Sequence, residues 1–206
     1  MKRIEHRYII LFIFLIVFVV ISCNNRKLSI PDYIQYVRSE DNGLLNKLNK
    51  GGYIFSALYE PSDYLTIKEL RNEKITKESF SKTHSKFSDY LYFDFSIKPE
   101  KSDSKILDQA DSVAYEKNFN HFSFDLSKDI FLLSKEDTLQ CLLHQFINSS
   151  GISPEYHFEL LFEKPDSLFT SRDSLFFMYD DKILNSGKVM IPILTKDIKS
   201  IPQLKI

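Results

Sequence analysis

The stretch that most limits the possible folds of this chain is a run of strict alternation over residues 90–97. Successive side chains of a β-strand point to opposite faces, so a period of two predicts a strand with one buried face. A register shift of one residue would move the whole apolar set into water. We therefore expect a central strand whose inner face carries Leu91, Phe93, Phe95 and Ile97 and whose outer face carries Tyr90, Tyr92, Asp94 and Ser96.

Shorter alternating or apolar runs indicate further strands, most of them in the second half of the chain. Residues 138–147 fit helical spacing as well as alternation, and a strand is favoured there. The last two runs flank a polar loop containing Gly187, which is the pattern of a hairpin. The predicted strands are residues 53–59, 130–133, 138–147, 156–163, 175–179 and 188–194.

Helix signals are fewer and lie mainly in the first half. Pro31 predicts a helix start, because proline suits the first helical position, and residues 60–63 indicate a second start. Residues 72–88 are polar and predict a loop, with a single helical turn within it as the alternative. Residues 102–104 offer caps for a third helix, whose apolar stripe would consist of Ile106, Leu107, Ala110, Val113 and Ala114.

These elements do not alternate in a regular strand–helix order, and the late strands cluster with turn signals between them. This order predicts an α+β fold with a mainly antiparallel sheet and a few short helices packed on it. The alternative is a β-sandwich with decorating helices.

The first twenty-three residues form a separate pattern. Three basic residues precede an uncharged run over residues 8–21, and Val20-Ile21-Ser22-Cys23 follows. As a helix the uncharged run would measure roughly 21 Å, whereas a bilayer core is about 30 Å thick. Its length therefore fits a secretory signal better than a permanent membrane span.

The residues Val20, Ile21, Ser22 and Cys23 resemble the lipobox of bacterial lipoproteins. The resemblance implies a diacylglyceryl group on the Cys23 thiol and cleavage before Cys23 by signal peptidase II. Two or three acyl chains on one residue would anchor it firmly, at about 0.8 kcal/mol per buried CH₂. The alternatives are an uncleaved signal anchor and cleavage by the ordinary signal peptidase, which bulky Val20 disfavours.

The resemblance also implies the organisation of the chain and its location. We expect a signal peptide over residues 1–22, a lipidated cysteine and short tether over residues 23–30, and one globular domain over residues 31–206. The chain is similar to small uncharacterised lipoproteins of the Bacteroidota. Asn24, Asn25, Arg26 and Lys27 lack the acidic cluster that accompanies surface export in that group, so we expect the domain to face the periplasm from the outer rather than the inner membrane.

Charge and cysteine content narrow the class of protein. Removal of residues 1–22 leaves 27 − 3 = 24 basic and 28 − 1 = 27 acidic side chains, a net charge of about −3. Without a basic excess, a nucleic-acid partner is not expected. Cys141 has no partner if Cys23 carries lipid, and its apolar neighbours predict a buried structural thiol.

The residues that could carry chemistry form only weak patterns. Cys141 and His144 could meet on a helix as a nucleophile pair or half a metal site, but would point apart on a strand. His157 and Glu159 share the polar face of a predicted strand and could hold a metal if a third ligand were near. Each pair is interpreted as structural, and the sequence predicts no catalytic, cofactor-binding or metal-binding residue.

An acidic group and a set of tyrosines also have both a functional and a structural interpretation. Asp180 and Asp181, with Asp173 nearby, lack the spacing of a calcium loop and are interpreted as turn residues. The tyrosines at positions 33, 36, 90 and 92 could form a binding surface or cover the sheet.

The function expected from these patterns is a membrane-anchored envelope module that binds or scaffolds an envelope protein and has no catalytic activity. A hydrolase or metal-dependent enzyme with a site assembled from distant residues is the alternative. Converging carboxylates or histidines in a cleft would favour the enzyme, an aromatic patch would favour the binding module, and a deep apolar pocket would favour a small-ligand binder.

Overall fold

The computed structural model describes residues 27–71, 73–101, 106–107, 111–135, 137–147, 154–164 and 174–206. The signal pattern, the lipobox and Cys23 lie outside this part of the chain. Within it, no helix combines the length and the apolar character that crossing a membrane requires.

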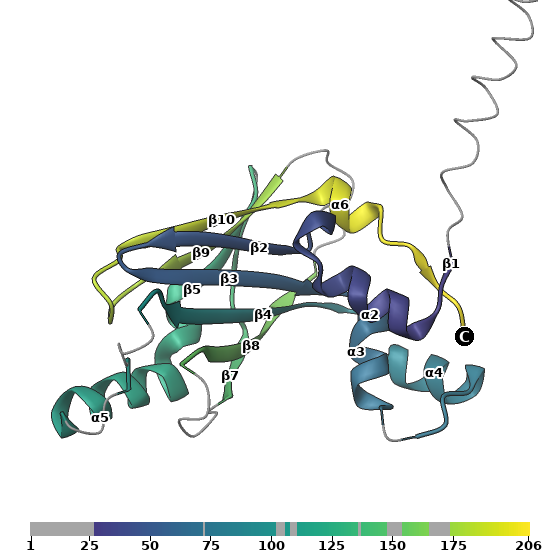
Figure 1. Cartoon of the computed structure of the whole chain (residues 1–206), viewed down its shortest axis with the longest axis horizontal. Helices are drawn as coiled ribbons and strands as arrows, with labels where there is room; N and C mark the ends of the chain where they lie inside the picture. The colour runs from purple at the N-terminus through teal and green to yellow at the C-terminus, as the bar shows by residue number, and fades with distance from the viewer. Residues whose placement is uncertain are drawn as a thin grey trace, which may run out of the picture.

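Most of the described strands form two antiparallel sheets (Figure 1). The five-stranded sheet has the order β2 (Leu45–Lys50), β3 (Tyr53–Glu60), β4 (Tyr90–Pro99), β8 (Tyr156–Glu163) and β7 (Leu143–Ile147). The four-stranded sheet has the order β10 (Lys188–Leu194), β9 (Ser174–Asp180), β5 (Ile130–Leu133) and β6 (Thr138–Gln140). The predicted α+β fold with mainly antiparallel strands is confirmed.

The two sheets face each other across an aromatic core. The ring centroid of Phe95 on β4 lies 5.0 Å from that of Phe177 and 5.4 Å from that of Tyr179, both on β9. Phe93 lies 5.9 Å from Phe177. The side chains predicted for the inner face of β4 are all essentially inaccessible to solvent, which confirms that prediction: Leu91, Phe93, Phe95 and Ile97. The sheets therefore also have the facing arrangement of the sandwich alternative.

Between residues 138 and 147 the chain passes from the four-stranded sheet to the five-stranded sheet through a bend. The backbone N–H of Cys141 donates to the carbonyl of Ile130 on β5, whereas the N–H of the next residue, Leu142, donates to the carbonyl of Leu161 on β8. The strand predicted over residues 138–147 is therefore confirmed as two short strands, β6 and β7. Such a switch closes the corner between two packed sheets.

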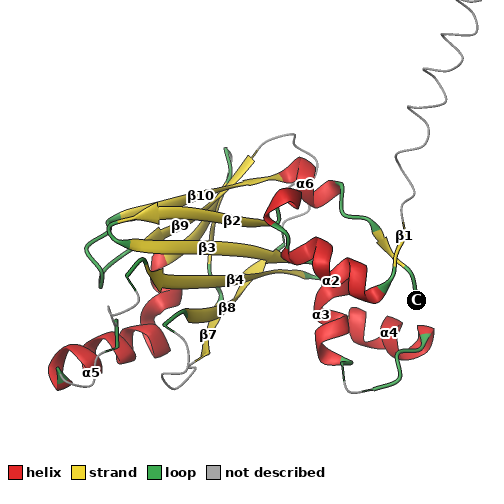
Figure 2. Cartoon of the chain, viewed as in Figure 1, coloured by secondary structure: helices red, strands yellow, loops and turns green. Residues whose placement is uncertain are grey.

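The helices gather mainly at the ends of the strands (Figure 2). One group is α2 (Ile30–Arg38), η1 (Glu40–Asn42), α3 (Ser62–Glu69), α4 (Lys77–His84) and α6 (Thr195–Lys199). The other is α5 (Ser112–Asn120), followed by the π-helical turn η2 (His121–Asp125) and the 3₁₀ turn η3 (Leu126–Asp129). The helix starts predicted at Pro31 and at residues 60–63 are confirmed by α2 and α3.

The chain enters the described domain beside its C-terminal segment. The short strand β1 (Lys27–Leu28) pairs in parallel with β11 (Gln203–Leu204), and the N–H of Lys205 donates to the carbonyl of Leu28 at 2.8 Å. This pairing places residues 27–28 beside the C-terminal segment, near α2 and α4 (Figure 1).

Some predicted elements were wrong. Residues 72–88 contain α4, whose Thr76 and Ser79 form a capping box, and the strand β2 had not been predicted. The third helix does not extend back to Ile106 and Leu107, which lie outside it; it begins at Ser112 with Asp111 as the N-cap. The proposed caps at residues 102–104 and Ala110 lie outside the described residues, and Val113, assigned to the buried stripe, is 78% exposed.

Candidate functional site

The outer face of the five-stranded sheet carries the polar half of the alternation. On β4 and β8 the residues opposite the core are paired across the ladder, Asp94 with Glu159 and Tyr92 with Leu161. At the end of β3, Glu60 pairs with Tyr92, and Pro61 then turns the chain directly into α3. α3 follows without a linker, and Lys68 near its end reaches back to Glu60, with its Nζ 2.9 Å from Oε1 of that residue.

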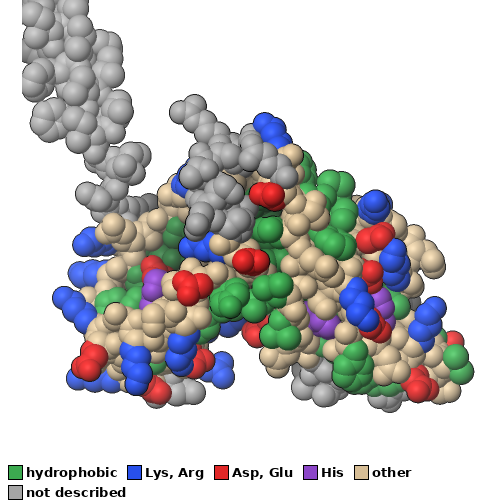
Figure 3. Space-filling model, turned by 180° about the vertical axis from the view of Figure 1, so that it is seen from behind, with side chains coloured by type: hydrophobic (Ala, Val, Ile, Leu, Met, Phe, Trp, Pro, Cys, Tyr) green, Lys and Arg blue, Asp and Glu red, His purple; other side chains and the backbone are tan. Residues whose placement is uncertain are grey.

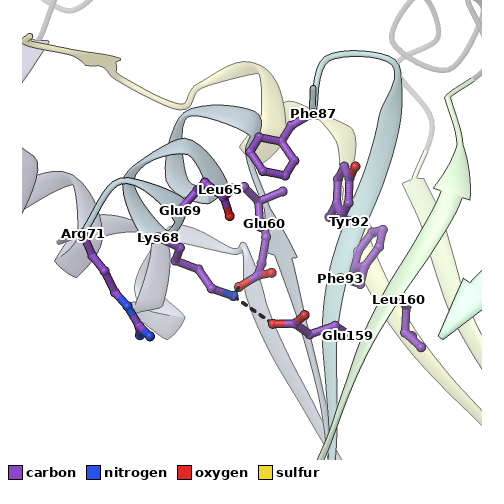
Figure 4. Close-up of a pocket in the computed structure, with 10 residues that line it drawn as sticks. All are labelled: Glu60, Leu65, Lys68, Glu69, Arg71, Phe87, Tyr92, Phe93, Glu159 and Leu160. Carbon is purple, nitrogen blue, oxygen red and sulfur yellow. Dashed lines mark hydrogen bonds and ion pairs between the residues drawn. The ribbon is translucent and has the colours of Figure 1, made fainter. Parts of the chain in front are cut away.

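A hollow of about 440 Å³ lies between α3 and this outer face (Figure 4). Its volume is in the range of small-ligand sites, about 300–1,000 Å³. We call it the Lys68 hollow. It is lined by Glu60, Leu65, Lys68, Glu69, Arg71, Phe87, Tyr92, Phe93, Glu159 and Leu160.

The charged side of the hollow is a shared ion pair. The Nζ of Lys68 lies 2.9 Å from Oε1 of Glu60 and 3.3 Å from Oε1 of Glu159, and 5.8 Å from the centre of the Tyr64 ring. Glu60 is only 4% exposed, whereas Lys68 is 39% exposed. The ammonium group therefore satisfies a buried carboxylate from the solvent side.

Burial and ion pairing shift the pKa values of these groups in opposite directions. Burial raises the pKa of Glu60, and the nearby ammonium of Lys68 only partly offsets it. Burial lowers the pKa of Lys68, but the carboxylates of Glu60 and Glu159 outweigh it and leave the pKa above its usual value. Lys68 is thus held in its charged form, and both neighbouring carboxylates are engaged.

The opposite side of the hollow is aromatic. Phe87 and Tyr92 meet edge to face with ring centroids 5.6 Å apart, across the hollow from Lys68 (Figure 4). The apolar character continues along the ladder from Tyr92 through Leu161 to Leu143, which is 62% exposed. The molecule seen from behind shows hydrophobic side chains gathered near the middle, with charged side chains on either side (Figure 3).

The predicted pair of His157 and Glu159 is divided between different partners. Nδ1 of His157 lies 3.1 Å from Oδ1 of Asp94, and this hydrogen bond raises the pKa of the imidazole despite its burial. Glu159 contacts Lys68 instead. No group of three or more His, Cys, Asp or Glu side chains suited to a metal ion occurs among the described residues.

Cys141 and His144 also have separate partners. The Cys141 thiol is buried as predicted, and it donates to the carbonyl of Leu143 at 3.1 Å. Burial raises its pKa to about 11, which disfavours the nucleophilic thiolate. Nε2 of His144 lies 2.9 Å from the carbonyl of Phe122, and burial lowers the pKa of this imidazole. The arrangement is that of two structural residues.

The acidic turn after β9 is organised by hydrogen bonds. The carboxylate of Asp181 is buried and accepts from the backbone N–H groups of Ile183, Leu184 and Ser186 at 2.6–2.9 Å. Asp181 therefore stabilises a turn, in agreement with its interpretation as a turn residue. Asp173 lies outside the described residues.

The four tyrosines considered as a binding surface differ in their exposure to solvent. Tyr33 is fully buried, whereas Tyr90 is 41% exposed and Tyr92 lines the Lys68 hollow. Tyr36 is half-buried and packs against the edge of the core. Only the pair on β4 thus remains as candidates for contact with a partner.

A second hollow, of about 320 Å³, lies where α3 and the end of α4 meet the segment around β11. It contains an ion pair in which Nε2 of His84 lies 3.2 Å from Oδ1 of Asp63. The buried hydroxyl of Tyr33 has no hydrogen-bond partner within the described part of the chain. The lining residues are Tyr33, Pro61, Ser62, Asp63, His84, Ser88, Lys164, Ile201, Pro202 and Gln203.

Comparison with known proteins adds little. No family model and no curated protein matches the chain. The crystal structure of a novel protein of unknown function from Burkholderia pseudomallei is similar over 84% of this chain and 93% of that chain, with a TM-score of 0.41 and 10% sequence identity. Similarity at this level carries no functional inference.

Proposed function

We propose that this protein is a lipid-anchored module of the cell envelope that binds a partner through the Lys68 hollow and does not catalyse a reaction. The anchor is the acylated Cys23, in the outer membrane, with the domain facing the periplasm. The lipobox resemblance of residues 20–23 supports this location. The partner is an envelope protein, and no nucleic acid is involved.

The observation that carries the binding role is the division of the hollow into a satisfied ionic side and a partly exposed aromatic side. Lys68 already contacts both Glu60 and Glu159, so the three side chains orient the site without being poised for reaction. Phe87 and Tyr92 provide a rigid apolar wall, and aromatic side chains of this kind are enriched at protein interfaces. The site suits an apolar side chain of a partner whose flanking polar groups meet Lys68 and Glu159.

The test uses the full lipidated chain in its native envelope, with a photo-crosslinking amino acid at Tyr92. A control places the same amino acid at Phe176, which is also partly exposed but lies on β9 in the other sheet. We expect a discrete adduct from position 92 that is weakened by Lys68→Met and absent from position 176. The intact mass of the crosslinked protein also distinguishes an adduct with a protein partner from an adduct with a small ligand. Equal adducts at both positions, or none at 92, would contradict the proposal.

The anchor is tested separately by comparing wild type with Cys23→Ala. We expect wild type to begin at Cys23, carry acyl mass and sediment with membranes, and the variant to lose all three properties. A wild-type protein that retained residues 1–22 would contradict this part of the proposal.

One observation favours the hydrolase alternative. Glu60 is a buried carboxyl with a raised pKa, in a hollow that also holds Glu159, and paired carboxyls of this kind serve as acid and base in hydrolases. Under that alternative Glu60→Gln abolishes turnover while the fold persists. Under the binding proposal the same variant changes affinity only.

A further inference from the structure

The tether end of the domain has a composition suited to a charged surface. Its elements are β1, α4 and β11, and the second hollow is lined by residues of α4 and β11 together. Lys27, Lys82 and Lys205 are exposed there and form no ion pair with any residue that the structure describes. Figure 3 shows this end at the left, where several Lys or Arg side chains project from the surface.

Two acidic groups at this end contact other residues, and a third, Glu78 on α4, is exposed. Asp63 lies 3.2 Å from Nε2 of His84, and Oδ2 of Asp32 accepts a hydrogen bond of 2.6 Å from the hydroxyl of Ser29. On β1, α4 and the segment that follows β11, the exposed lysines outnumber the exposed acidic side chain of Glu78: they are Lys27, Lys77, Lys82 and Lys205. Their natural counterpart is an anionic surface.

The position of the tether brings that end close to the anchor. Lys27 is held in β1 by its pairing with Gln203, so the domain cannot swing freely about residue 27. Cys23 precedes Lys27 by four Cα–Cα steps, which span at most about 14 Å in any conformation. A charge attracts an anionic membrane within about one Debye length, roughly 8 Å at physiological salt, and Lys side chains extend towards it.

We propose that this end, with Lys27, Lys82 and Lys205, lies against the anionic phospholipid headgroups of the membrane that holds the anchor. This inference rests on the lipid anchor of the proposed function. Its consequence is a fixed orientation, in which β1, α4 and β11 face the lipid and the opposite end, with α5 and the β2–β3 hairpin, points away from the membrane.

The test is amine labelling of the full lipidated chain in two kinds of vesicle. One contains phosphatidylcholine alone and the other contains phosphatidylcholine with phosphatidylglycerol. On anionic vesicles we expect Lys27, Lys82 and Lys205 to be labelled about fivefold more slowly than on neutral vesicles, as expected for a contact with an anionic leaflet. Lys98 and Lys117, exposed at the far end, are the matched controls and should be labelled equally on both.

A pair of charge variants sharpens the result. Lys82→Glu with Lys205→Glu should abolish the protection of Lys27, whereas Lys98→Glu with Lys117→Glu should leave it intact. Protein that floats with the vesicles but shows equal labelling of near and far lysines, or the same protection on neutral lipid, overturns this inference alone. Protein that does not float overturns the anchor, and this inference with it.

Discussion

The two faces of the five-stranded sheet are built from the same strands but by different physical means. The inner face is packed with aromatic rings, as where Phe95 lies between Phe158, at 5.9 Å, and Phe177, at 5.0 Å. The outer face is organised by polar pairs such as Glu60 with Lys68 and Asp94 with His157. The inner face therefore depends on shape and burial, and the outer face depends on matched charges that can also meet a partner.

The largest expected effect tests the inner face. Phe93→Ala should destabilise the domain by about 3–5 kcal/mol, because it removes a fully buried ring that packs against Phe162 and Phe177 and leaves a cavity. Its neighbour on the outer face is the matched control. Tyr92→Ala should cost less than half as much, since that ring is only partly covered. Denaturant midpoints of both variants give the comparison, and equal losses would contradict the division of the sheet into two kinds of face.

The next effect tests the ionic half of the outer face. Lys68→Met should lower the free energy of unfolding by about 1–3 kcal/mol, because it leaves the buried Glu60 carboxylate without its partner. The loss should be smaller than for a fully buried pair, since Lys68 is partly exposed. The loss should shrink as the pH falls towards and below 4.5, where the raised pKa of Glu60 makes its carboxyl neutral.

The control for this variant is the exposed pair of Lys86 with Glu69, 3.4 Å apart. Lys86→Met should change stability by less than about 0.5 kcal/mol. If the two lysine variants had equal effects in chemical denaturation, burial of Glu60 would not be what gives the Lys68 pair its importance.

A smaller effect is expected at the bend between the sheets. Cys141→Ser should cost about 1–2 kcal/mol, because a hydroxyl replaces a thiol in an apolar setting while the bond to the Leu143 carbonyl can persist. In the native protein the thiol should resist alkylation at neutral pH, given its burial and a pKa of about 11. Modification as fast as that of the denatured chain would show that the bend is open.

The smallest effect concerns the pH dependence of the outer face. The pKa of His157 is raised above 6.5 by Asp94, so its stabilising contribution is fully present below pH 6.5 and disappears as the pH rises through the folded-state pKa. The histidine is 40% exposed, which limits this contribution to less than about 1 kcal/mol. Urea midpoints at about pH 5.5 and about pH 8.5 should differ more for wild type than for Asp94→Asn. An unchanged difference would exclude this pair as its source.

The strands with a clear apolar period were predictable to within a residue or two. Three of them, β5, β8 and β10, have the predicted bounds, because each buries one face and polar residues mark its ends. The strand β2 escaped prediction because its sequence, Leu-Asn-Lys-Leu-Asn-Lys, has no period of two. It pairs with β3 as an edge strand through a hairpin at Gly51 and Gly52, whose φ values of 62° and 82° favour glycine.

The candidate site was only partly accessible to prediction. Tyr92 and Glu159 were singled out, but Glu159 was paired with His157, its neighbour on the same strand face, and not with Lys68. The ion pair with Lys68 joins residues 91 positions apart, and its third member, Glu60, looked like part of a helix start. No local pattern signals such a contact, since it depends on how α3 lies against the sheet.

The amino-acid order alone was sufficient for the α+β class, the inward set of β4 and the burial of Cys141, because each follows from a local period or from nearby apolar residues. The pairing of strands into two facing sheets, the hollow beside α3 and the joining of β1 to β11 depended on the tertiary structure. These features arise from contacts between distant segments, whose free energy depends on the packing of the whole domain and leaves no local signature in the chain.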